Sequence, residues 1–296
     1  MSTVSEPPAV AGQNVEILRP ERQSVPLVFT SPHSGRDYPK GFVAASALDP
    51  VALRRSEDSF VDELFAAAPE FGAPLLKALF PRAFIDPNRE PFELDPAMFV
   101  DELPSYANSQ SSRVAAGLGT IPKVVSNGRE IYRAKLSFAE AAERINVYYR
   151  PYHKALAALV NETVERFGFC VLIDCHSMPS VGGPLDPDAA RGRADFVLGD
   201  GFGNSCEDRV TATVERALRA QGHSVIRNKP FAGGFTTRHY GKPSTGVHAL
   251  QIEINRALYM DELTIERRDG IHRLTRQMVD VIVALNGLGG LDLAAE

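Results

Sequence analysis

The sequence is poor in cysteine and shows no disulfide pattern. Cys170, Cys175 and Cys206 are its three cysteines in 296 residues, and their spacing is irregular. Small secreted domains carry many regularly spaced cysteines, whereas cytosolic proteins keep their thiols reduced. We therefore expect free thiols and a cytoplasmic location.

Long apolar runs and an excess of positive charge are also missing. No apolar run approaches the roughly 20 residues that a membrane-spanning helix needs. The opening MSTVSEPPAVAGQ lacks the basic segment followed by an apolar one that marks a secretory signal. The formal net charge is -5 at pH 7, which disfavours nucleic acid and anionic membranes as partners. We expect no membrane segment and no nucleic-acid partner, and the sequence does not indicate an oligomeric state.

Several motifs that bind nucleotides or present a nucleophile are absent as well. The glycines in GLG, GFG and LGG lack the flanking strand and helix of a GxGxxG phosphate loop, and there is no GxxxxGKS/T segment. The sequence has neither a CxxC pair nor a GxSxG nucleophile elbow. These absences leave a metal-activated water as the best available nucleophile.

What is present is an alternation of strand patterns with helical ones. Strands are predicted at residues 25–30, 73–80, 82–86, 169–176, 194–200, 223–228 and 248–255, and helices at 56–72, 136–168, 206–222 and 261–285. Pro151 should kink or break the second helix. This order predicts an α/β fold with a central mixed sheet and helices on both faces, as one catalytic domain over 21–296 after a flexible lead-in over 1–20. Residues 87–130 should form a long excursion that covers a site.

Two histidines stand where buried strands end. His33 follows the apolar run VPLVFTSP, and His176 closes the run FCVLIDCH. The carboxyl ends of strands open onto the ligand crevice of α/β proteins, so two such histidines favour a metal site. Asp174 shares a strand face with His176, because side chains alternate along a strand, and can orient its ring. A buried Asp-His pair that only holds the loop is the alternative.

A catalytic metal site with two histidines needs a carboxylate ligand and an open position for water. The segment SEDSFVDELF offers Glu57, Asp58 and Asp62 at the start of a predicted helix with Ser56 as its N-cap. Acidic residues in a first helical turn also complement the helix dipole. The alternative for each of them is therefore a solvated carboxylate that binds no metal. As a set they are the best supply of a ligand before His176.

Glu253 is the candidate general base. It lies in the predicted strand HALQIEIN, where polar and apolar residues alternate, a pattern that an exposed edge strand would share. The glycine-rich loop before this strand suggests instead that it borders a pocket. Partial burial there would raise the pKa of Glu253 towards the range in which a carboxylate accepts protons near neutral pH.

Arg89 is the candidate substrate-binding arginine. It follows Asn88 in FIDPNREPF, and an arginine can bind a carboxylate with two parallel hydrogen bonds. A surface salt bridge is the alternative. The segment ERINVYYRPYHKAL adds Arg144, and GGFTTRHYG adds Thr237 and His239 after two glycines that permit backbone close to a ligand.

Seven short segments in order form a specific pattern. They are SPHSG, SEDSFVDELF, FIDPNRE, RINVYYRPYHKAL, LIDCHSMPS, FAGGFTTRHYG and LQIEINRALYMDE. The likeness that they mark runs from about residue 24 to residue 285. Together they resemble the N-formylglutamate amidohydrolase family. The resemblance implies a mixed sheet between helices, similar to the zinc carboxypeptidase and phosphorylase/hydrolase-like folds. It also implies removal of formate from N-formyl-L-glutamate, a step of histidine degradation.

The resemblance also implies roles for individual residues. His33, Asp58 and His176 would bind one divalent metal ion, expected to be zinc, with Glu57 as the alternative carboxylate ligand. Glu253 would be the catalytic glutamate. Histidine and carboxylate ligands suit zinc, iron, manganese and cobalt alike, so the identity of the metal stays open.

The remaining site residues are expected to contact the substrate. Arg89 would bind a substrate carboxylate or the developing oxyanion, and Asn88, Arg144, Thr237 and His239 would line the substrate pocket. The resulting hypothesis is a metal-dependent amidohydrolase for N-formylglutamate or a similar small N-acyl acidic amino acid. The alternatives are a carboxypeptidase-like enzyme or acylamino-acid deacylase for a larger acyl group, and a non-catalytic carboxylate-binding protein.

Overall fold

A mixed seven-stranded sheet organises the computed structural model, which describes residues 14–184 and 186–290. Its strands are β1 (Val15–Leu18), β2 (Leu27–Ser31), β3 (Leu75–Ala78), β4 (Cys170–Met178), β5 (Phe196–Gly199), β6 (Val225–Arg227) and β7 (Val247–Asn255). Their order is β1-β3-β2-β4-β7-β5-β6. β1 and β5 run antiparallel to β3 and β7, and the other neighbours are parallel. The predicted single α/β domain with a mixed sheet is confirmed.

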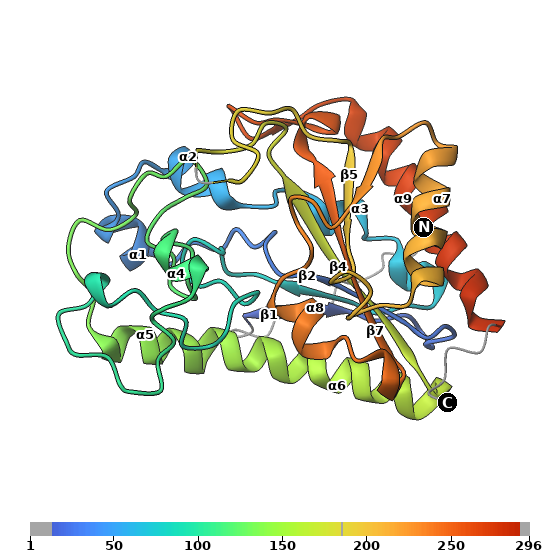
Figure 1. The fold of residues 1–296 in the computed structure, drawn as a ribbon, viewed down its shortest axis with the longest axis horizontal. Helices are drawn as coiled ribbons and strands as arrows, with labels where there is room; N and C mark the ends of the chain where they lie inside the picture. The colour runs from blue at the N-terminus through green and yellow to red at the C-terminus, as the bar shows by residue number, and fades with distance from the viewer. Residues whose placement is uncertain (1–13, 185, 291–296) are drawn as a thin grey trace, which may run out of the picture.

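Helices cover both faces of this sheet (Figure 1). The helices of the described residues are α1 (Lys40–Ala45), α2 (Pro50–Leu53), α3 (Val61–Leu64), α4 (Ser112–Ala115), α5 (Phe138–Arg144), α6 (Arg150–Phe167), α7 (Asp208–Ala220), α8 (Phe235–Tyr240) and α9 (Gly270–Asn286). α6 packs on one face, and α3, α7 and α9 pack on the other. Among the described residues, none of the helices combines the length and hydrophobicity needed to traverse a bilayer.

The α6 face of the sheet changes character along β4 and β7. Leu172 belongs to the apolar core under α6, whereas the next residues on the same face of β4 are Asp174 and His176. On β7, Ala249 lies in that core and is followed on its face by Gln251 and Glu253. The parallel register places His176 beside Glu253. The polar halves of both strands therefore meet at one edge of the sheet.

The prediction of a single helix over residues 56–72 is wrong. The segment instead contains a 3-10 turn at Arg54–Ser56, the short helix α3 and a second 3-10 turn at Ala68–Phe71. Two features interrupt a continuous helix. The backbone N–H of Asp58 donates to the His33 carbonyl at 3.0 Å, and Phe60 has a left-handed φ of 67°. Asp58 thus lies on a loop that is held against the His33 loop.

The helix expected over 136–168, with a kink or break at Pro151, is present in three parts. α5 passes into a π-helical turn at Ile145–Tyr149, which leads directly into α6. Pro151 falls in the first turn of α6, where a missing backbone N–H is tolerated. Pro151 therefore does not break the helix, and the π-helical turn before it absorbs the irregularity.

Four smaller predictions also differ from the structure. Residues 82–86 form a turn that begins at Pro81 rather than a strand, with Phe84 N donating to the Pro81 carbonyl. The glycine-rich loop expected before the strand of Glu253 contains α8. The last helix begins at Gly270, because β8 (Met260–Asp261) and β9 (Glu266–Arg267) form a small separate sheet before it. The lead-in expected over 1–20 contains β1, and its residues 1–13 lie outside the described residues.

Candidate active site

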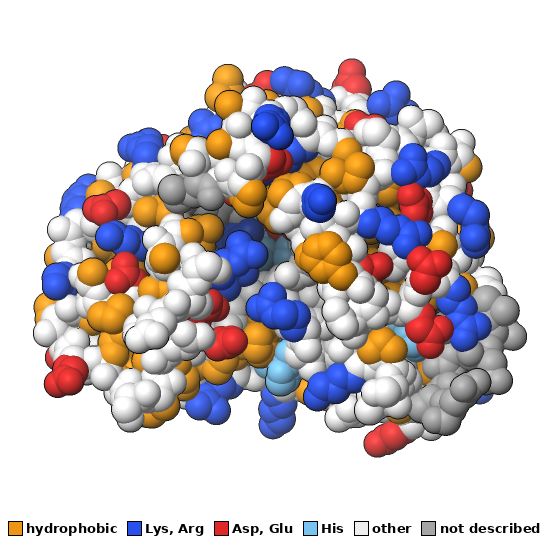
Figure 2. All heavy atoms as spheres, viewed as in Figure 1, with side chains coloured by type: hydrophobic (Ala, Val, Ile, Leu, Met, Phe, Trp, Pro, Cys, Tyr) orange, Lys and Arg blue, Asp and Glu red, His pale blue; other side chains and the backbone are white. Residues whose placement is uncertain are grey.

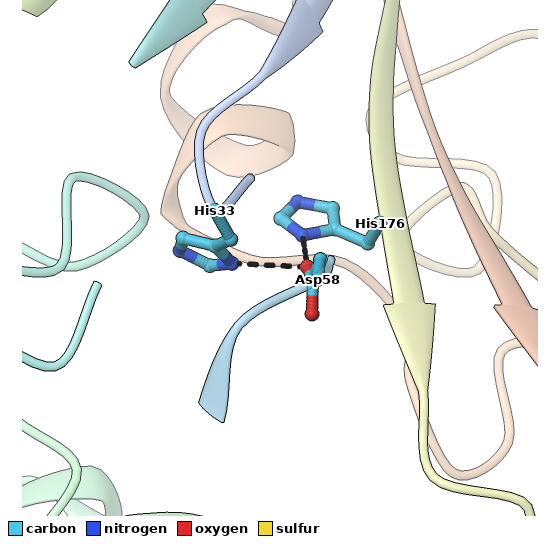
Figure 3. Close-up of side chains that lie close together, drawn as sticks. All are labelled: His33, Asp58 and His176. Atoms are coloured by element: carbon cyan, nitrogen blue, oxygen red, sulfur yellow. Dashed lines mark hydrogen bonds and ion pairs between the residues drawn. The ribbon is translucent and has the colours of Figure 1, made fainter. Parts of the chain in front are cut away.

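Three side chains from separate parts of the chain converge at the edge where β2 and β4 end (Figure 3). They are His33 on the loop after β2, Asp58 on the loop before α3, and His176 on β4. Asp58 Oδ2 lies 2.9 Å from His176 Nδ1 and 3.3 Å from His33 Nδ1. One ligand atom from each residue can be chosen so that all lie within 4.8 Å of one another. Two imidazoles and a carboxylate at this spacing match the donor set of a catalytic divalent metal site.

The far side of each imidazole ring is held by a further carboxylate. His33 Nε2 lies 2.7 Å from Asp86 Oδ1, and His176 Nε2 lies 3.0 Å from Asp174 Oδ2. Such bonds favour the tautomer with the proton on Nε2, so the lone pair of Nδ1 is directed into the site. His33 Nδ1 is buried and forms no hydrogen bond. A metal ion would supply the partner that this atom lacks.

The structure distinguishes Asp58 from Glu57 as the carboxylate beside the histidines. Asp58 is fully buried among them. Glu57 turns away, and its carboxylate accepts a hydrogen bond from Arg54 Nε at 2.6 Å. Asp62 is an ion-pair partner of Arg36, so neither alternative acid belongs to the cluster.

Charges within the cluster oppose the cost of burial. Burial raises the pKa of Asp58, but the hydrogen bond from His176 and the neighbouring His33 ring outweigh it and hold that pKa well below its usual range. Burial lowers the pKa of His176, but the charge of Asp174 and the hydrogen bonds to Asp174 and Asp58 raise it well above the ordinary histidine value. A bound cation would displace the proton on Nδ1 of His176, because ligation requires the unprotonated nitrogen.

Two arginines form hydrogen bonds with the carboxylates of Asp58 and Asp86. Arg256, just after β7, donates to Asp58 Oδ1 at 3.0 Å and to Ser177 Oγ at 3.1 Å. Arg82 donates to Asp86 Oδ2 at 2.8 Å. The sequence reasoning missed both arginines, since each stands on a turn where no periodic pattern marks its direction.

A cavity of about 130 Å³ opens over the histidines. Figure 2 shows a hollow near the middle of this face, with Lys or Arg and His side chains in and around it. Its lining joins strand ends to the predicted excursion and consists of His33, Ser56, Arg82, Asp86, Asn88, Arg89, Arg113, Leu118, Pro122, Val124, Val125, Ser126, His176, Ser177, Met178, Pro179, Asp186, Arg193, Phe231, Gly233, Gly234, Gln251, Glu253 and Arg256. The expectation that residues 87–130 cover a site is therefore confirmed.

Glu253 reaches this cavity from the middle of the sheet. β7 lies between β4 and β5, so the interpretation as an exposed edge strand is wrong. Gln251 Nε2 donates to Glu253 Oε1 at 2.9 Å, which orients the carboxylate. Burial raises the pKa of Glu253 to about 7, although the charges of His176 and the nearby arginines oppose this effect. A carboxyl group with this pKa can exchange protons near neutral pH.

Arg89 also lines the cavity, but most of its guanidinium is already engaged. Its Nε donates to the Leu118 carbonyl at 2.8 Å and its Nη1 to the Asn88 carbonyl at 2.7 Å. Nη2 lies 3.8 Å from Asp86 Oδ2. Arg89 is 8% exposed, so the interpretation as a surface salt bridge is wrong. Burial lowers its pKa to about 10, which leaves the group charged at neutral pH.

Asn88 lines the cavity and ties its parts together. Its Nδ2 donates to Asp174 Oδ2 at 3.2 Å, and its Oδ1 accepts from Thr236 N at 2.8 Å. A Cβ atom at Gly234 would collide with the Asn88 amide, so this position requires glycine. Asn88 thereby holds the α8 loop against the carboxylate that supports His176.

The remaining three predicted substrate contacts do not line the cavity. Arg144 donates to the Phe84 carbonyl at 3.1 Å, and its guanidinium stacks 4.2 Å above the Phe84 ring. Its side chain is therefore buried against Phe84. Thr237 is fully buried and donates to the Gly234 carbonyl, so it supports the glycine turn. His239 is exposed and stacks on Phe235 in α8. The structure corrects the placement of all three.

Comparisons with known protein sequences agree with one another. The family model described as N-formylglutamate amidohydrolase matches residues 25–260. An N-formylglutamate deformylase of Pseudomonas aeruginosa is 32% identical over 252 residues, which cover 83% of this chain and 86% of that protein. An N-formylglutamate deformylase of Pseudomonas putida is 28% identical over 251 residues, with the same coverage of 83% and 86%.

A solved structure extends the likeness to the fold. The crystal structure of N-formylglutamate amidohydrolase from Ralstonia eutropha JMP134 has a TM-score of 0.84 and 39% sequence identity, and the alignment covers 94% of this chain and 97% of that one. The family match spans most of the chain, including His33, Asp58 and His176. The chain is an amide hydrolase that belongs to the N-formylglutamate amidohydrolase family.

Proposed function

We propose that this protein hydrolyses N-formyl-L-glutamate, or a similar N-acyl acidic amino acid, to the free amino acid and formate in a metal-dependent reaction. The observation that carries the proposal is the meeting of three metal-ligating side chains, His33, Asp58 and His176, with Glu253 at one cavity. The names of the related proteins support the choice of substrate.

His33 Nδ1, His176 Nδ1 and the Asp58 carboxylate would hold a single divalent ion, for which zinc is the first candidate. Such an ion, when bound, lowers the pKa of water and polarises the carbonyl group. Asp86 and Asp174 hold the two rings in the orientation that ligation requires. Arg256 and Arg82 keep Asp58 and Asp86 ionised by hydrogen bonding and charge.

Glu253 would act as general base and then as general acid. Its carboxylate takes a proton from the attacking water and afterwards delivers that proton to the leaving amine. A pKa of about 7 suits both steps, because the group can be charged before the attack and neutral after it. The hydrogen bond from Gln251 Nε2 holds Oε1 of Glu253 in place.

The arginines of the cavity would bind the anionic substrate. Arg89 has Nη2 as the nitrogen that no backbone carbonyl occupies, so it can donate a charge-assisted hydrogen bond to a substrate carboxylate or to the developing oxyanion. Asn88 would border the same position. The names of the related proteins favour a formyl group over the larger acyl groups of the alternative deacylase.

The test is a comparison of two substrates with metal-loaded protein. We expect free glutamate from N-formyl-L-glutamate and a lower rate from N-acetyl-L-glutamate, measured by glutamate release. Absence of glutamate from both substrates, with zinc, iron, manganese or cobalt, would contradict the proposal and favour a non-catalytic carboxylate-binding protein. We further propose, from the likeness to the N-formylglutamate amidohydrolase family, that the reaction serves histidine degradation in the cytoplasm.

A further inference from the structure

Five arginines line the cavity, and they differ in whether their side chains already have partners within the protein. Four of them have hydrogen-bond partners within the protein. These pairs are Arg82 with Asp86, Arg89 with the Leu118 carbonyl, Arg193 with Asp188, and Arg256 with Asp58. The side chain of the fifth, Arg113, forms no hydrogen bond or ion pair within residues 14–184 and 186–290, and it is exposed at the cavity.

The backbone of Arg113 is nevertheless well fixed. Arg113 lies in α4, whose first turn is capped by Ser111, with Val114 N donating to Ser111 Oγ at 3.0 Å. The carbonyl of Arg113 accepts a hydrogen bond from Leu118 N at 2.8 Å. The Leu118 carbonyl in turn accepts from Arg89 Nε at 2.8 Å. One short stretch of loop therefore places both arginines on the same wall of the cavity.

The two arginines on this wall are close enough to influence each other. Burial is the main cause that lowers the pKa of Arg89, and the positive charge of Arg113 adds to it. Two like charges side by side raise the local positive potential, which an anionic ligand can neutralise. A substrate with two carboxylates offers one negative group for each of them.

We propose that Arg113 is a specificity-determining residue that binds the side-chain carboxylate of the substrate, while Arg89 lies deeper and meets the carboxylate nearer the formyl group. This inference rests on the proposed function. It follows from pairing: Arg82, Arg193 and Arg256 would have to give up a partner inside the protein to bind a ligand. Arg89 has only Nη2 to offer, whereas Arg113 would lose only water. The substrate class is therefore N-formyl amino acids with an acidic side chain.

The proposal predicts discrimination against a neutral side chain of equal size. N-formyl-L-glutamine has nearly the same shape as N-formyl-L-glutamate but carries no side-chain charge, so it cannot form an ion pair with two parallel hydrogen bonds to Arg113. We expect the wild-type protein to show a higher kcat/KM for the glutamate compound. In Arg113→Gln, the ratio of the two kcat/KM values should fall about tenfold. In Arg113→Glu, repulsion should lower the ratio further.

Arg129→Gln is the matched control. Arg129 is an exposed arginine in the same excursion, it does not line the cavity, and its replacement removes the same charge from the protein. The preference for the glutamate compound should stay at the wild-type ratio in this variant. A fall in both variants would mean that net charge alone steers the substrate, and it would overturn the assignment to Arg113.

The experiment separates two kinds of failure. If the wild-type protein hydrolyses neither compound, the proposed function fails before Arg113 is tested. If the wild-type protein hydrolyses N-formyl-L-glutamate and Arg113→Gln keeps the wild-type preference, the inference is overturned and the proposed function stands. Thermal unfolding of each variant should match that of the wild type, since an exposed side chain without a partner contributes little to stability.

Discussion

The cavity has two walls that are built in different ways. One wall consists of strand ends, where His176 on β4 and Glu253 on β7 stand side by side in the centre of the sheet. Each of these side chains is held by a neighbour, Asp174 in one case and Gln251 in the other. The other wall belongs to residues 87–130, whose regular structure is limited to a 3-10 turn at Pro96–Met98 and to α4.

This difference separates the reaction from the choice of substrate. A metal ligand and a general base must keep fixed positions, which the hydrogen-bonded centre of a sheet provides. A carboxylate at some distance from the reacting atoms needs only a suitably placed charge, and a loop can supply it and change it in evolution without harm to the core. Substitutions in the strand wall should therefore lower the rate with every substrate. Substitutions in the loop wall should change which substrate is preferred.

Among the substitutions that test this difference between the walls, we expect the largest loss of activity at Glu253. Glu253→Gln keeps the shape of the side chain but cannot accept a proton, so kcat should fall by roughly 100-fold to 10,000-fold. The variant should still bind its metal, because Glu253 is not among the ligating group. Steady-state kinetics and metal analysis check both points. Wild-type kcat in the metal-loaded variant would contradict the role of Glu253 as the base.

A smaller loss is expected at the carboxylate that supports His176. Asp174→Asn removes the charge that orients the ring, and changes of this kind cost roughly 10-fold to 100-fold in metal affinity or activity. Asp200→Asn is a suitable control, since Asp200 is a buried carboxylate at the end of β5 that accepts hydrogen bonds from Asn228 and Thr211. It should lower stability without a change in metal affinity. Titration with a metal buffer measures the difference.

On the loop wall, Arg89→Ala should lower kcat/KM for N-formyl-L-glutamate by at least about tenfold while the metal stays bound. Arg89→Lys should recover only part of the activity, because an ammonium group cannot serve two loop carbonyls and a substrate with the geometry of a guanidinium. A loss confined to KM would indicate carboxylate binding, whereas equal losses in kcat and kcat/KM would indicate oxyanion stabilisation. Wild-type values in both variants would remove Arg89 from the site.

The pH dependence offers the mildest way to test the strand wall. Burial raises the pKa of Glu253 to about 7, and a base must be ionised to act, so kcat/KM should fall as the pH drops below this value. A bound cation favours the carboxylate and moves the acidic limb to lower pH. A profile measured with Glu253→Gln should lack this limb. The same limb in both proteins would assign it to another group.

The sequence predicts the strand wall far better than the loop wall. Alternation along two strands puts Asp174 with His176 and Gln251 with Glu253, and parallel pairing brings their polar ends together. Local pattern failed where contacts between distant segments decide the conformation. Asp58 lies on a loop because its backbone bonds to the loop of His33, and no spacing within residues 56–72 records that bond.

Arginine was the residue type for which sequence reasoning was least reliable. Arg144 lies on the same predicted helix as several aromatic residues. In the structure it is buried against Phe84 and does not line the cavity. Arg113 and Arg256, which do line the cavity, stand in a short helix and in a turn after a strand. A long side chain can point in many directions from such positions, so its destination depends on the tertiary structure.

The central claim is that His33, Asp58 and His176 hold the catalytic metal ion, and the most direct measurement is the metal content of purified protein together with its activity on N-formyl-L-glutamate. We predict about one divalent ion per chain in the wild type and a loss of both metal and activity in His176→Ala. His272→Ala, which removes an exposed histidine on α9, should keep both. Full metal content and full activity in His176→Ala would contradict the account.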